Sequence, residues 1–277
     1  MKLVTFVDQG AIKGGRVDDG DVRAFRLGSR TFRLEEWLDS GNALADLETD
    51  SPISVGTLTL LPPILCPRKI LCVGANFEEH RREMGRPRPE HPMIFTRFAE
   101  TLVGHRGCLV RPRASGAYDY EGELCCVIGR TARHLTPDNA LEAVAGFSIF
   151  NDGTARDWQK HTSQFTPGKN FDRTAGFGPW MVTRDEINDL DTLVLQTRVN
   201  GEVRQQAQLS DLTFSVVDLL VYISTFTTLM PGDLVVCGTP SGVGASFDPP
   251  RFLSAGDLVE ISISGIGTLV NEVVAEA

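Results

Sequence analysis

The sequence predicts an α+β protein that is rich in β-strands and has few helices. Short apolar runs of strand length recur along the chain, among them Lys69–Gly74 and Leu234–Cys237, and turns rich in glycine, proline and aspartate separate them. Asn200-Gly201, between two such runs, is the strongest short signal for a β-hairpin. After Arg68 the strands do not alternate with long helices, which argues against a doubly wound sheet or an eight-helix barrel.

In chain order, the sequence predicts a small N-terminal α/β domain over residues 1–67 and a main domain over residues 68–277. The first part contains a predicted strand over Arg16–Leu27 and a short predicted helix over Leu34–Ser40. The stretch Pro62–Arg68 reads as the boundary. We find no chemical motif before it, so packing or subunit contact is the default role of the small domain.

Three later elements complete the prediction. Thr136 and Pro137 precede a short helix predicted over Asp138–Ala145. The hairpin of Leu193–Val199 turns at Asn200-Gly201. A buried helix is predicted over Phe214–Phe226, because Asp218, Ser224 and several threonines interrupt the apolar segment from Val216 to Met230.

Composition excludes several classes of function. The chain has 277 residues and a formal net charge of -9, which disfavours binding to nucleic acid or to an anionic membrane. The first residues lack the apolar region of a signal peptide, and no window is long and apolar enough to span a membrane. The six cysteines form no C-x-x-C pair, as in a cytoplasmic protein with reduced thiols. We therefore expect a cytoplasmic protein.

The stretch Asp119-Tyr120-Glu121-Gly122-Glu123 leads into an apolar strand and carries the clearest chemical signal. Glu121 and Glu123 share one face of the strand, and Asp152 follows a second apolar strand. Adjacent carboxylates on a mostly apolar strand are tolerated when a cation lies between them. We interpret Glu121, Glu123 and Asp152 as the ligands of one divalent metal ion. The alternative is that the two glutamates form the solvent face of an antiparallel sheet.

The segment that contains His80 and Glu83 has helical composition, so the two side chains face the same way. Such a pair can form an imidazole oriented by a carboxylate, which is the usual arrangement of a general base. By spacing alone, a solvated charged helix is the better interpretation. The charged, proline-broken segment Arg86–Pro92 that follows is typical of a surface lid.

A glycine-rich loop follows the strand Leu234–Cys237 and carries Thr239. It lacks the Gly-Lys-Ser/Thr sequence of a phosphate-binding loop. Its glycines allow close backbone approach to a ligand, and Thr239 can then donate to a carboxylate. An ordinary tight turn explains the same residues equally well.

The order of these segments resembles the fumarylacetoacetate hydrolase family over Lys69 to Asn271. The resemblance is carried by Lys69–Phe77, Asp119–Glu123, Asn151-Asp152 with Ala155-Arg156-Asp157, Gly168-Lys169, Gly178-Pro179-Trp180, Val199–Glu202, Pro231-Gly232-Asp233, Gly238–Pro240 with Gly242–Gly244, and Gly265–Leu269. Two positions depart from the family pattern. Gly153-Thr154 replaces the commoner Val-Ser, and Arg97 stands where lysine is frequent.

This resemblance implies a β-rich roll of packed mixed sheets, usually a homodimer. It implies Mg²⁺ or Mn²⁺ at Glu121, Glu123 and Asp152, with Ca²⁺ as a substitute in crystals. It also implies chemistry on 2-oxo acids: C–C hydrolysis of a diketo acid, decarboxylation of an oxo acid or isomerisation of a hydroxy-dienedioate. In the acylpyruvate hydrolase and oxaloacetate decarboxylase branch, the residues that match His80 and Glu83 act as a catalytic dyad.

Our hypothesis from the sequence is a metal-dependent hydrolase that cleaves a C–C bond in a 2,4-diketo acid through an enolate. The alternatives are an isomerase or decarboxylase, and a binding protein of the same fold without activity. Lys169 is expected to stabilise the developing oxyanion or to pair with Asp152. Gln205 and Thr239 are expected to bind the substrate carboxylate. Arg156 is a further candidate for substrate binding, although pairing with Asp157 or holding the turn is the simpler expectation.

Overall fold

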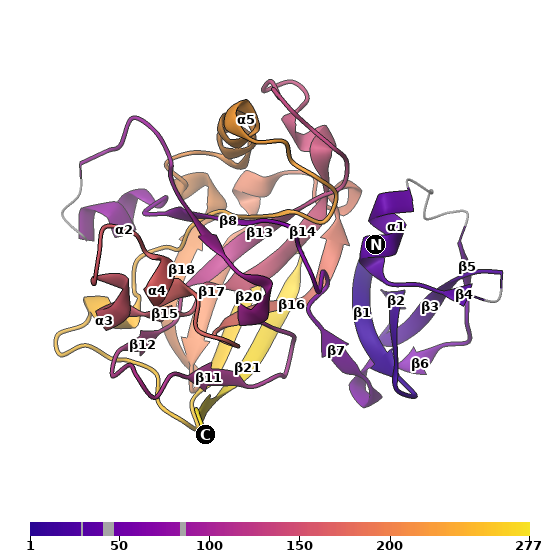
Figure 1. Cartoon of the computed structure of the whole chain (residues 1–277), viewed down its shortest axis with the longest axis horizontal. Helices are drawn as coiled ribbons and strands as arrows, with labels where there is room; N and C mark the ends of the chain where they lie inside the picture. The colour runs from indigo at the N-terminus through magenta and orange to yellow at the C-terminus, as the bar shows by residue number, and fades with distance from the viewer. Residues whose placement is uncertain (29, 41–46, 84–86) are drawn as a thin grey trace.

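A computed structural model of the chain describes residues 1–28, 30–40, 47–83 and 87–277, without the side chains of Leu27, His80, Arg81 and Glu83. The largest element in these ranges is a 14-stranded mixed sheet (Figure 1). Its main path runs through β4 (Arg30–Thr31), β3 (Asp21–Leu27), β2 (Ala11–Asp18), β1 (Lys2–Asp8), β16 (Ala175–Thr183), β14 (Val144–Asn151), β13 (Gly122–Ile128), β19 (Leu234–Val236), β8 (Ile70–Gly74) and β9 (Met93–Arg97). Four short strands pair beside this path: β5 (Glu48–Thr49), β6 (Ile53–Ser54), β7 (Thr59–Leu61) and β10 (Leu102–Val103).

A second sheet of five strands packs against the middle of the first. Its order is β11 (Leu109–Arg111), β21 (Gly267–Ala275), β20 (Leu258–Ile263), β17 (Val194–Val199) and β18 (Glu202–Gln208). A two-stranded sheet joins β12 (Tyr118–Asp119) to β15 (Thr154–Ala155). The α-helices in the described ranges are α1 (Leu34–Ser40), α2 (Glu78–Glu83), α3 (Arg156–Gln159), α4 (Thr166–Lys169) and α5 (Val216–Phe226). The predicted β-rich α+β class is confirmed.

The strand β13 lies at the centre of the core and is buried along its whole length. Leu124 and Cys126 on one face join the apolar cluster shared with the five-stranded sheet. Cys125 and Val127 on the other face join a second cluster that also contains Cys72 of β8. A strand covered on both faces must be apolar on both faces, and this explains the continuous apolar run in its sequence. Glu123 lies on the same face as Cys125 and Val127, so its carboxylate enters the second cluster.

The N-terminal strands extend the large sheet, because Lys2 of β1 pairs with Val182 of β16. They lie together at the right of Figure 1. The division at residues 67 and 68 stays a prediction, and the helix predicted over Leu34–Ser40 is confirmed as α1. The single strand predicted over Arg16–Leu27 is wrong. Asp19 and Gly20 have φ values of 49° and 87° and form the turn between β2 and β3.

The predicted hairpin at Asn200-Gly201 is confirmed between β17 and β18, with φ values of 51° and 78° at its two turn residues. The helix predicted over Phe214–Phe226 is α5, which begins two residues later after the capping residue Ser215. The helix predicted over Asp138–Ala145 is wrong. Only a short 3₁₀ turn forms over Ala140–Ala143, because Val144 already pairs with Ile128 as the first residue of β14.

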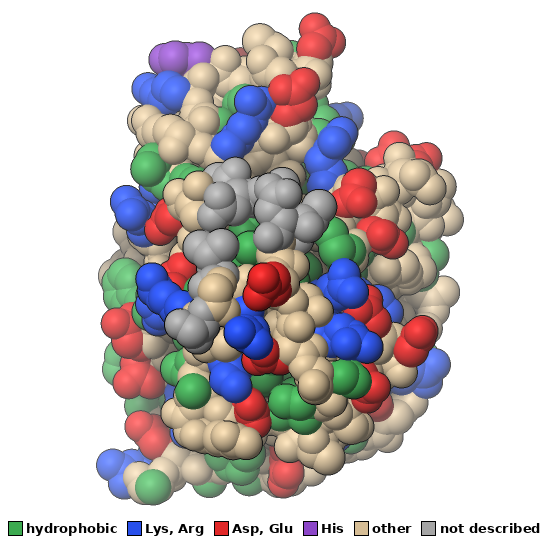
Figure 2. Space-filling view, turned by 90° about the vertical axis from the view of Figure 1, so that its right-hand side faces the viewer, with side chains coloured by type: hydrophobic (Ala, Val, Ile, Leu, Met, Phe, Trp, Pro, Cys, Tyr) green, Lys and Arg blue, Asp and Glu red, His purple; other side chains and the backbone are tan. Residues whose placement is uncertain are grey.

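Figure 2 shows the side of the molecule that carries the N-terminal strands. Acidic and basic side chains alternate over this face, and it presents no broad field of one sign. Electrostatic binding of nucleic acid requires such a basic field, and this face does not provide one. In the described ranges, no helix combines the length and the apolar character that crossing a membrane requires.

His105 gives the fold a predictable sensitivity to acid. Its Nδ1 accepts a hydrogen bond from the Val270 N–H at 3.2 Å, and burial, with a smaller effect of Arg106, lowers its pKa from 6.5 to about 4. Because the folded-state pKa lies below the unfolded-state value, protonation favours the unfolded chain. Because His105 is only partly buried, solvent screening reduces the effect, and we expect His105 to contribute a loss of about 1–2 kcal/mol as the pH falls from about 6.5 to about 4.

Urea unfolding of the wild type and of His105→Asn across this pH range measures the effect. Asparagine keeps an acceptor for the Val270 N–H and cannot be protonated, so its stability curve is expected to be flatter. Parallel curves for the two proteins would show that His105 is not the responsible group.

Candidate metal centre and active site

The hairpin of β13 and β14 assembles the three predicted metal ligands. Gly122 pairs with Asn151 in register, and the Asp152 N–H donates to the Glu121 carbonyl oxygen at 2.8 Å. Glu121 and Glu123 flank Gly122, so their side chains project to the same side of the strand. One carboxylate oxygen of each of Glu121, Glu123 and Asp152 lies within 4.8 Å of the others. The antiparallel register therefore brings together residues about thirty positions apart.

This acidic cluster is buried. Glu121 is 6% exposed, Glu123 1% and Asp152 0%. The alternative interpretation of the two glutamates as a solvent-facing pair is therefore wrong. Three buried carboxylates at this distance repel each other and lose hydration, so they require positive charge nearby.

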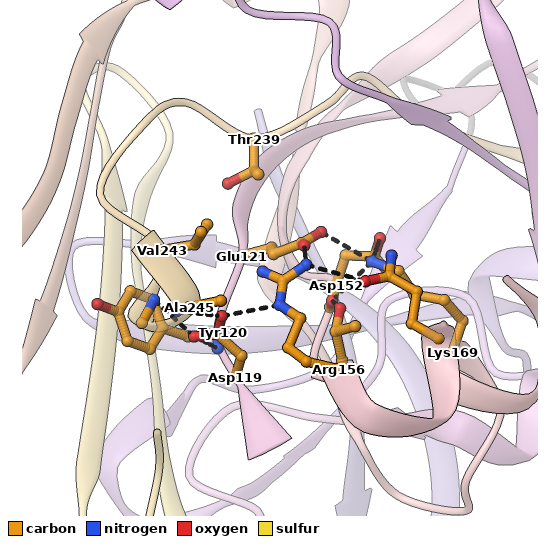
Figure 3. Close-up of polar contacts among 12 residues, drawn as sticks. Asp119, Tyr120, Glu121, Asp152, Arg156, Lys169, Thr239, Val243 and Ala245 are labelled. Atoms are coloured by element: carbon orange, nitrogen blue, oxygen red, sulfur yellow. Dashed lines mark hydrogen bonds and ion pairs between the residues drawn. The ribbon is translucent and has the colours of Figure 1, made fainter. Parts of the chain in front are cut away.

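Lys169 supplies part of that charge from α4. Its Nζ lies 2.7 Å from Glu121 Oε2 and 2.5 Å from Asp152 Oδ2. Figure 3 shows Lys169 beside these two carboxylates. Burial alone lowers the pKa of Lys169, but the carboxylates of Asp152 and Glu121 outweigh that effect and raise the pKa above its ordinary value. Lys169 is therefore a fixed positive charge in the site. The predicted ion pair with Asp152 is present.

Arg97 supplies a second charge from the end of β9. Its Nη1 lies 2.6 Å from Asp152 Oδ1, and both side chains are fully buried. From the sequence, Arg97 was a departure from a family pattern with an expected effect on the choice of substrate, and no partner was predicted for it. The available signal was a charged residue at the end of the strand Met93–Arg97, which is not enough to identify a partner 55 residues away.

Arg156 of α3 supplies a third charge. Its Nε donates to Asp119 Oδ2 at 2.8 Å, and its Nη1 lies 2.6 Å from Glu121 Oε1 (Figure 3). The expected pairing with Asp157 is wrong, because Asp157 accepts from the Ser115 hydroxyl at 2.6 Å instead. The Nη2 of Arg156 is buried and has no hydrogen-bond partner among the described residues, and Arg156 lines the cavity.

Asp119 is a further residue of the site, and sequence reasoning did not predict its role. Its carboxylate accepts from the N–H groups of Tyr120, Gly244 and Ala245 as well as from Arg156. Asp119 thus joins the glycine-rich loop to the Arg156 guanidinium and holds both beside Glu121.

Glu123 is the carboxylate of the cluster without a cation. Its Oε2 accepts from the Gly238 N–H at 2.5 Å, and no ion pair of Glu123 occurs within the described residues. Burial, followed by the charges of Asp152 and Glu121, raises the pKa of Glu123 well above its ordinary value. A buried carboxylate in this position, in a set of purely oxygen donors, fits a hard divalent cation such as Mg²⁺, Mn²⁺ or Ca²⁺.

Thr239 and Gln205 lie on the other side of the cluster. Gln205 Nε2 donates to Thr239 Oγ1 and to the Pro240 carbonyl, both at 2.9 Å, and its Oε1 accepts from the Gly122 N–H at 3.0 Å. Thr239 lines the cavity above Glu121 in Figure 3 and donates to the Gly122 carbonyl at 2.9 Å. Substrate binding by Thr239 and Gln205 stays a prediction. In this structure both amide hydrogens of Gln205 are already donated.

The cluster opens into a cavity of about 950 Å³. The residues that line it include the charged Glu121, Glu123 and Lys169 and the apolar Met93 and Phe95. Lys169 Nζ lies 5.0 Å from the centre of the Phe95 ring, so charged and apolar groups adjoin. Such a lining suits an organic acid, because its chain can contact the apolar side chains while its carboxylate requires a bound cation at the acidic cluster.

The side chains of the predicted dyad lie outside the described part of the structure. His80 and Glu83 belong to α2, which confirms the helix, but their side chains are not among the described atoms. Their role as general base and orienting carboxylate stays a prediction. The predicted lid Arg86–Pro92 falls partly outside the described residues, since Arg86 is not described.

Known proteins share this fold and much of this sequence. Residues 69–274 match the family described as fumarylacetoacetate (FAA) hydrolase C-terminal. The chain is 42% identical over 246 residues to oxaloacetate tautomerase YisK of Bacillus subtilis (strain 168), which covers 87% of this chain and 80% of that protein. The fumarylacetoacetate hydrolase EaFAH from psychrophilic Exiguobacterium antarcticum has a TM-score of 0.88 and 38% identity, with 100% of both chains covered. The 2-hydroxyhepta-2,4-diene-1,7-dioate isomerase from Mycobacterium marinum has a TM-score of 0.82 and 31% identity, covering 100% of this chain and 99% of that one. The chain described here therefore belongs to the fumarylacetoacetate hydrolase family.

Proposed function

We propose that this protein is a divalent-metal-dependent enzyme that interconverts the keto and enol forms of a 2-oxo acid such as oxaloacetate. The observation that carries the proposal is the buried cluster of Glu121, Glu123 and Asp152, which opens into a cavity of about 950 Å³ beside two cationic side chains. The oxaloacetate tautomerase of Bacillus subtilis, 42% identical to this chain, supports the choice of reaction.

Glu121, Glu123 and Asp152 are the residues that would hold the metal ion. When bound, a divalent cation supplies Lewis acidity that stabilises negative charge on the 2-oxo oxygen. The buried charges of the described site are four carboxylates and three cations, namely Asp119, Glu121, Glu123 and Asp152 with Arg97, Arg156 and Lys169. This set leaves one negative charge in excess and repels an organic acid. A divalent cation reverses the sign, so we expect the metal to bind before the substrate.

Two residues of the chain account for binding and charge stabilisation. Lys169 keeps its proton and places a positive charge beside the carboxylate cluster, where charge develops on the oxygen of an enolate. Arg156 lines the cavity and places a second positive charge beside Glu121, which favours binding of a substrate carboxylate once a metal ion is bound. Tautomerisation requires these two functions and a proton transfer, but no attacking water.

A second candidate is hydrolysis of a C–C bond in a 2,4-diketo acid. The similarity to the hydrolase EaFAH over the full length of both chains favours it. Hydrolysis requires a base that activates water, and His80 oriented by Glu83 is our candidate for that base. His80→Ala is then expected to lose C–C hydrolysis while it retains Mn²⁺ binding and any tautomerase activity. Loss of Mn²⁺ binding in this variant would show that His80 has been misplaced.

The test is a substrate panel assayed with Mg²⁺, with Mn²⁺ and with EDTA. The panel contains the enol of oxaloacetate, acylpyruvates and a hydroxy-dienedioate. The decrease in enol absorbance measures tautomerisation, and the release of pyruvate measures decarboxylation. We expect metal-dependent loss of the oxaloacetate enol. Turnover of the enol that persists in EDTA would refute the metal-dependent mechanism, and turnover of acylpyruvates alone would favour the hydrolase.

We also propose that the protein is a homodimer, as the resemblance to the family implies. Light scattering after size-exclusion chromatography measures the molar mass, and a value of one chain would refute this proposal.

A further inference from the structure

Arg97 is held by an unusually complete set of contacts for a residue that does not line the cavity. Its Nη1 donates to Asp152 Oδ1 at 2.6 Å and to the Gly153 carbonyl at 2.9 Å. Its Nη2 donates to Thr174 Oγ1 at 2.8 Å, and its Nε points to Thr101 Oγ1 at 3.4 Å. The guanidinium thus binds both the carboxylate of Asp152 and the carbonyl of the next residue, Gly153.

These contacts fix the orientation of the Asp152 carboxylate. Arg97 binds Oδ1, while Lys169 lies 2.5 Å from Oδ2. Lys169 also contacts Glu121, so Oδ2 is the oxygen on the side of the acidic cluster. A planar carboxylate bound at both oxygens by cations from different segments cannot rotate without breaking one of the two ion pairs.

Thr174, the third anchor of Arg97, is itself held in place. The Tyr118 hydroxyl donates to the Thr174 carbonyl at 2.8 Å, and Thr174 Oγ1 donates to the Phe171 carbonyl at 2.7 Å. Gly153 permits this arrangement, since a Cβ at that position would lie 2.0 Å from the Thr174 carbonyl oxygen. The two departures from the family pattern, Arg97 and Gly153, are therefore parts of one assembly.

We propose that Arg97 is a positioning residue that presents Asp152 Oδ2 to the metal ion. The proposal rests on the metal centre proposed above. The planar guanidinium reaches Asp152, Gly153 and Thr174 together, whereas the ammonium of a lysine is a point charge on a flexible stem. Arg97 acts through Asp152 and has no contact with the substrate.

The first test is isothermal titration of the protein with Mn²⁺ in the absence of substrate. Arg97→Lys keeps the positive charge but loses the planar guanidinium that reaches several acceptors at once, so we expect Mn²⁺ to bind about 10-fold more weakly. At saturating Mn²⁺, the KM for the 2-oxo acid is expected to stay at the wild-type value, because Arg97 does not line the cavity. Wild-type affinity in Arg97→Lys would show that Arg97 contributes charge alone and would overturn the proposal.

A second pair of variants keeps Arg97 and changes only its anchor. Thr174→Val removes the hydroxyl at nearly constant volume, and we expect a several-fold loss of Mn²⁺ affinity. Thr174→Ser retains the hydroxyl and is expected to restore affinity to near the wild-type value. Equal affinities for Val and Ser at this position would also overturn the proposal.

Lys69→Met is the control for a general loss of stability. It breaks the ion pair with the buried Asp233, 2.7 Å away and outside the acidic cluster. We expect a lower melting temperature in EDTA and unchanged Mn²⁺ affinity. If Arg97→Lys behaves in the same way, Arg97 is merely structural. If the wild type itself binds no Mn²⁺, the metal centre fails as well, and this outcome is distinct from the others.

Discussion

Glu123→Gln is expected to abolish Mn²⁺ binding and catalysis while it raises the melting temperature of the metal-free protein. Glu123 is 1% exposed, has no ion pair within the described residues and lies beside Glu121 and Asp152. Its charge therefore destabilises the metal-free fold, and burial, followed by repulsion from Asp152 and Glu121, raises the pKa of Glu123. Glutamine keeps an oxygen acceptor for the Gly238 N–H and removes the charge. We expect a gain of about 1–3 kcal/mol in the unfolding free energy at pH 7.

Thermal unfolding in EDTA and titration with Mn²⁺ measure the two effects separately. Glu142→Gln is the matched control, since Glu142 forms an exposed ion pair with Arg130 and should change neither quantity. A fall in the melting temperature of Glu123→Gln in EDTA would contradict this account, because it would show that the Glu123 carboxylate stabilises the metal-free fold. Normal Mn²⁺ affinity in the variant would remove Glu123 from the metal centre.

The sequence predicted the acidic cluster because its geometry depends on short-range rules. Side chains two apart on a strand share a face, and this placed Glu121 beside Glu123. Asp152 was located by its position at the end of a second apolar run, and the antiparallel register of β13 and β14 brings it beside Glu121. The Asn200-Gly201 hairpin was predictable for the same reason, since the turn chemistry is contained in two residues. Asp19-Gly20 carried the same signal within the wrongly predicted strand.

The cations of the site could not be placed from the sequence, because their partners are set by the tertiary arrangement. Arg97 reaches Asp152 because β9 pairs with β8, which lies beside β19 in the same sheet as β14. Arg156 was expected to pair with its neighbour Asp157, but that carboxylate accepts bonds from the Ser115–Gly116 segment. The helix predicted after Pro137 failed because strand pairing at Val144 outweighed the local helical preference.

Lys169→Met is expected to have the opposite effect on stability to Glu123→Gln. Lys169 is buried between Glu121 Oε2 and Asp152 Oδ2, and its removal leaves these two carboxylates without a shared counter-charge. Breaking a buried ion pair by removing one partner costs about 3–5 kcal/mol. We therefore expect a large fall in melting temperature in EDTA, and a larger stabilisation by Mn²⁺ than in the wild type, because the metal replaces part of the missing charge. Activity at saturating Mn²⁺ should fall by a factor of about 10²–10³, since the oxyanion loses its neighbouring cation.

The double variant Glu123→Gln with Lys169→Met tests whether the two residues belong to one electrostatic unit. If they do, removing one negative and one positive charge together is expected to cost less than the sum of the separate effects in EDTA, because each change offsets the imbalance left by the other. Lys160→Met, at an exposed lysine of the same cavity, controls for the loss of a positive charge near the substrate. Strict additivity would show that Lys169 and Glu123 do not interact. Full activity of Lys169→Met at saturating Mn²⁺ would exclude Lys169 from the reaction and leave it only the structural ion pair.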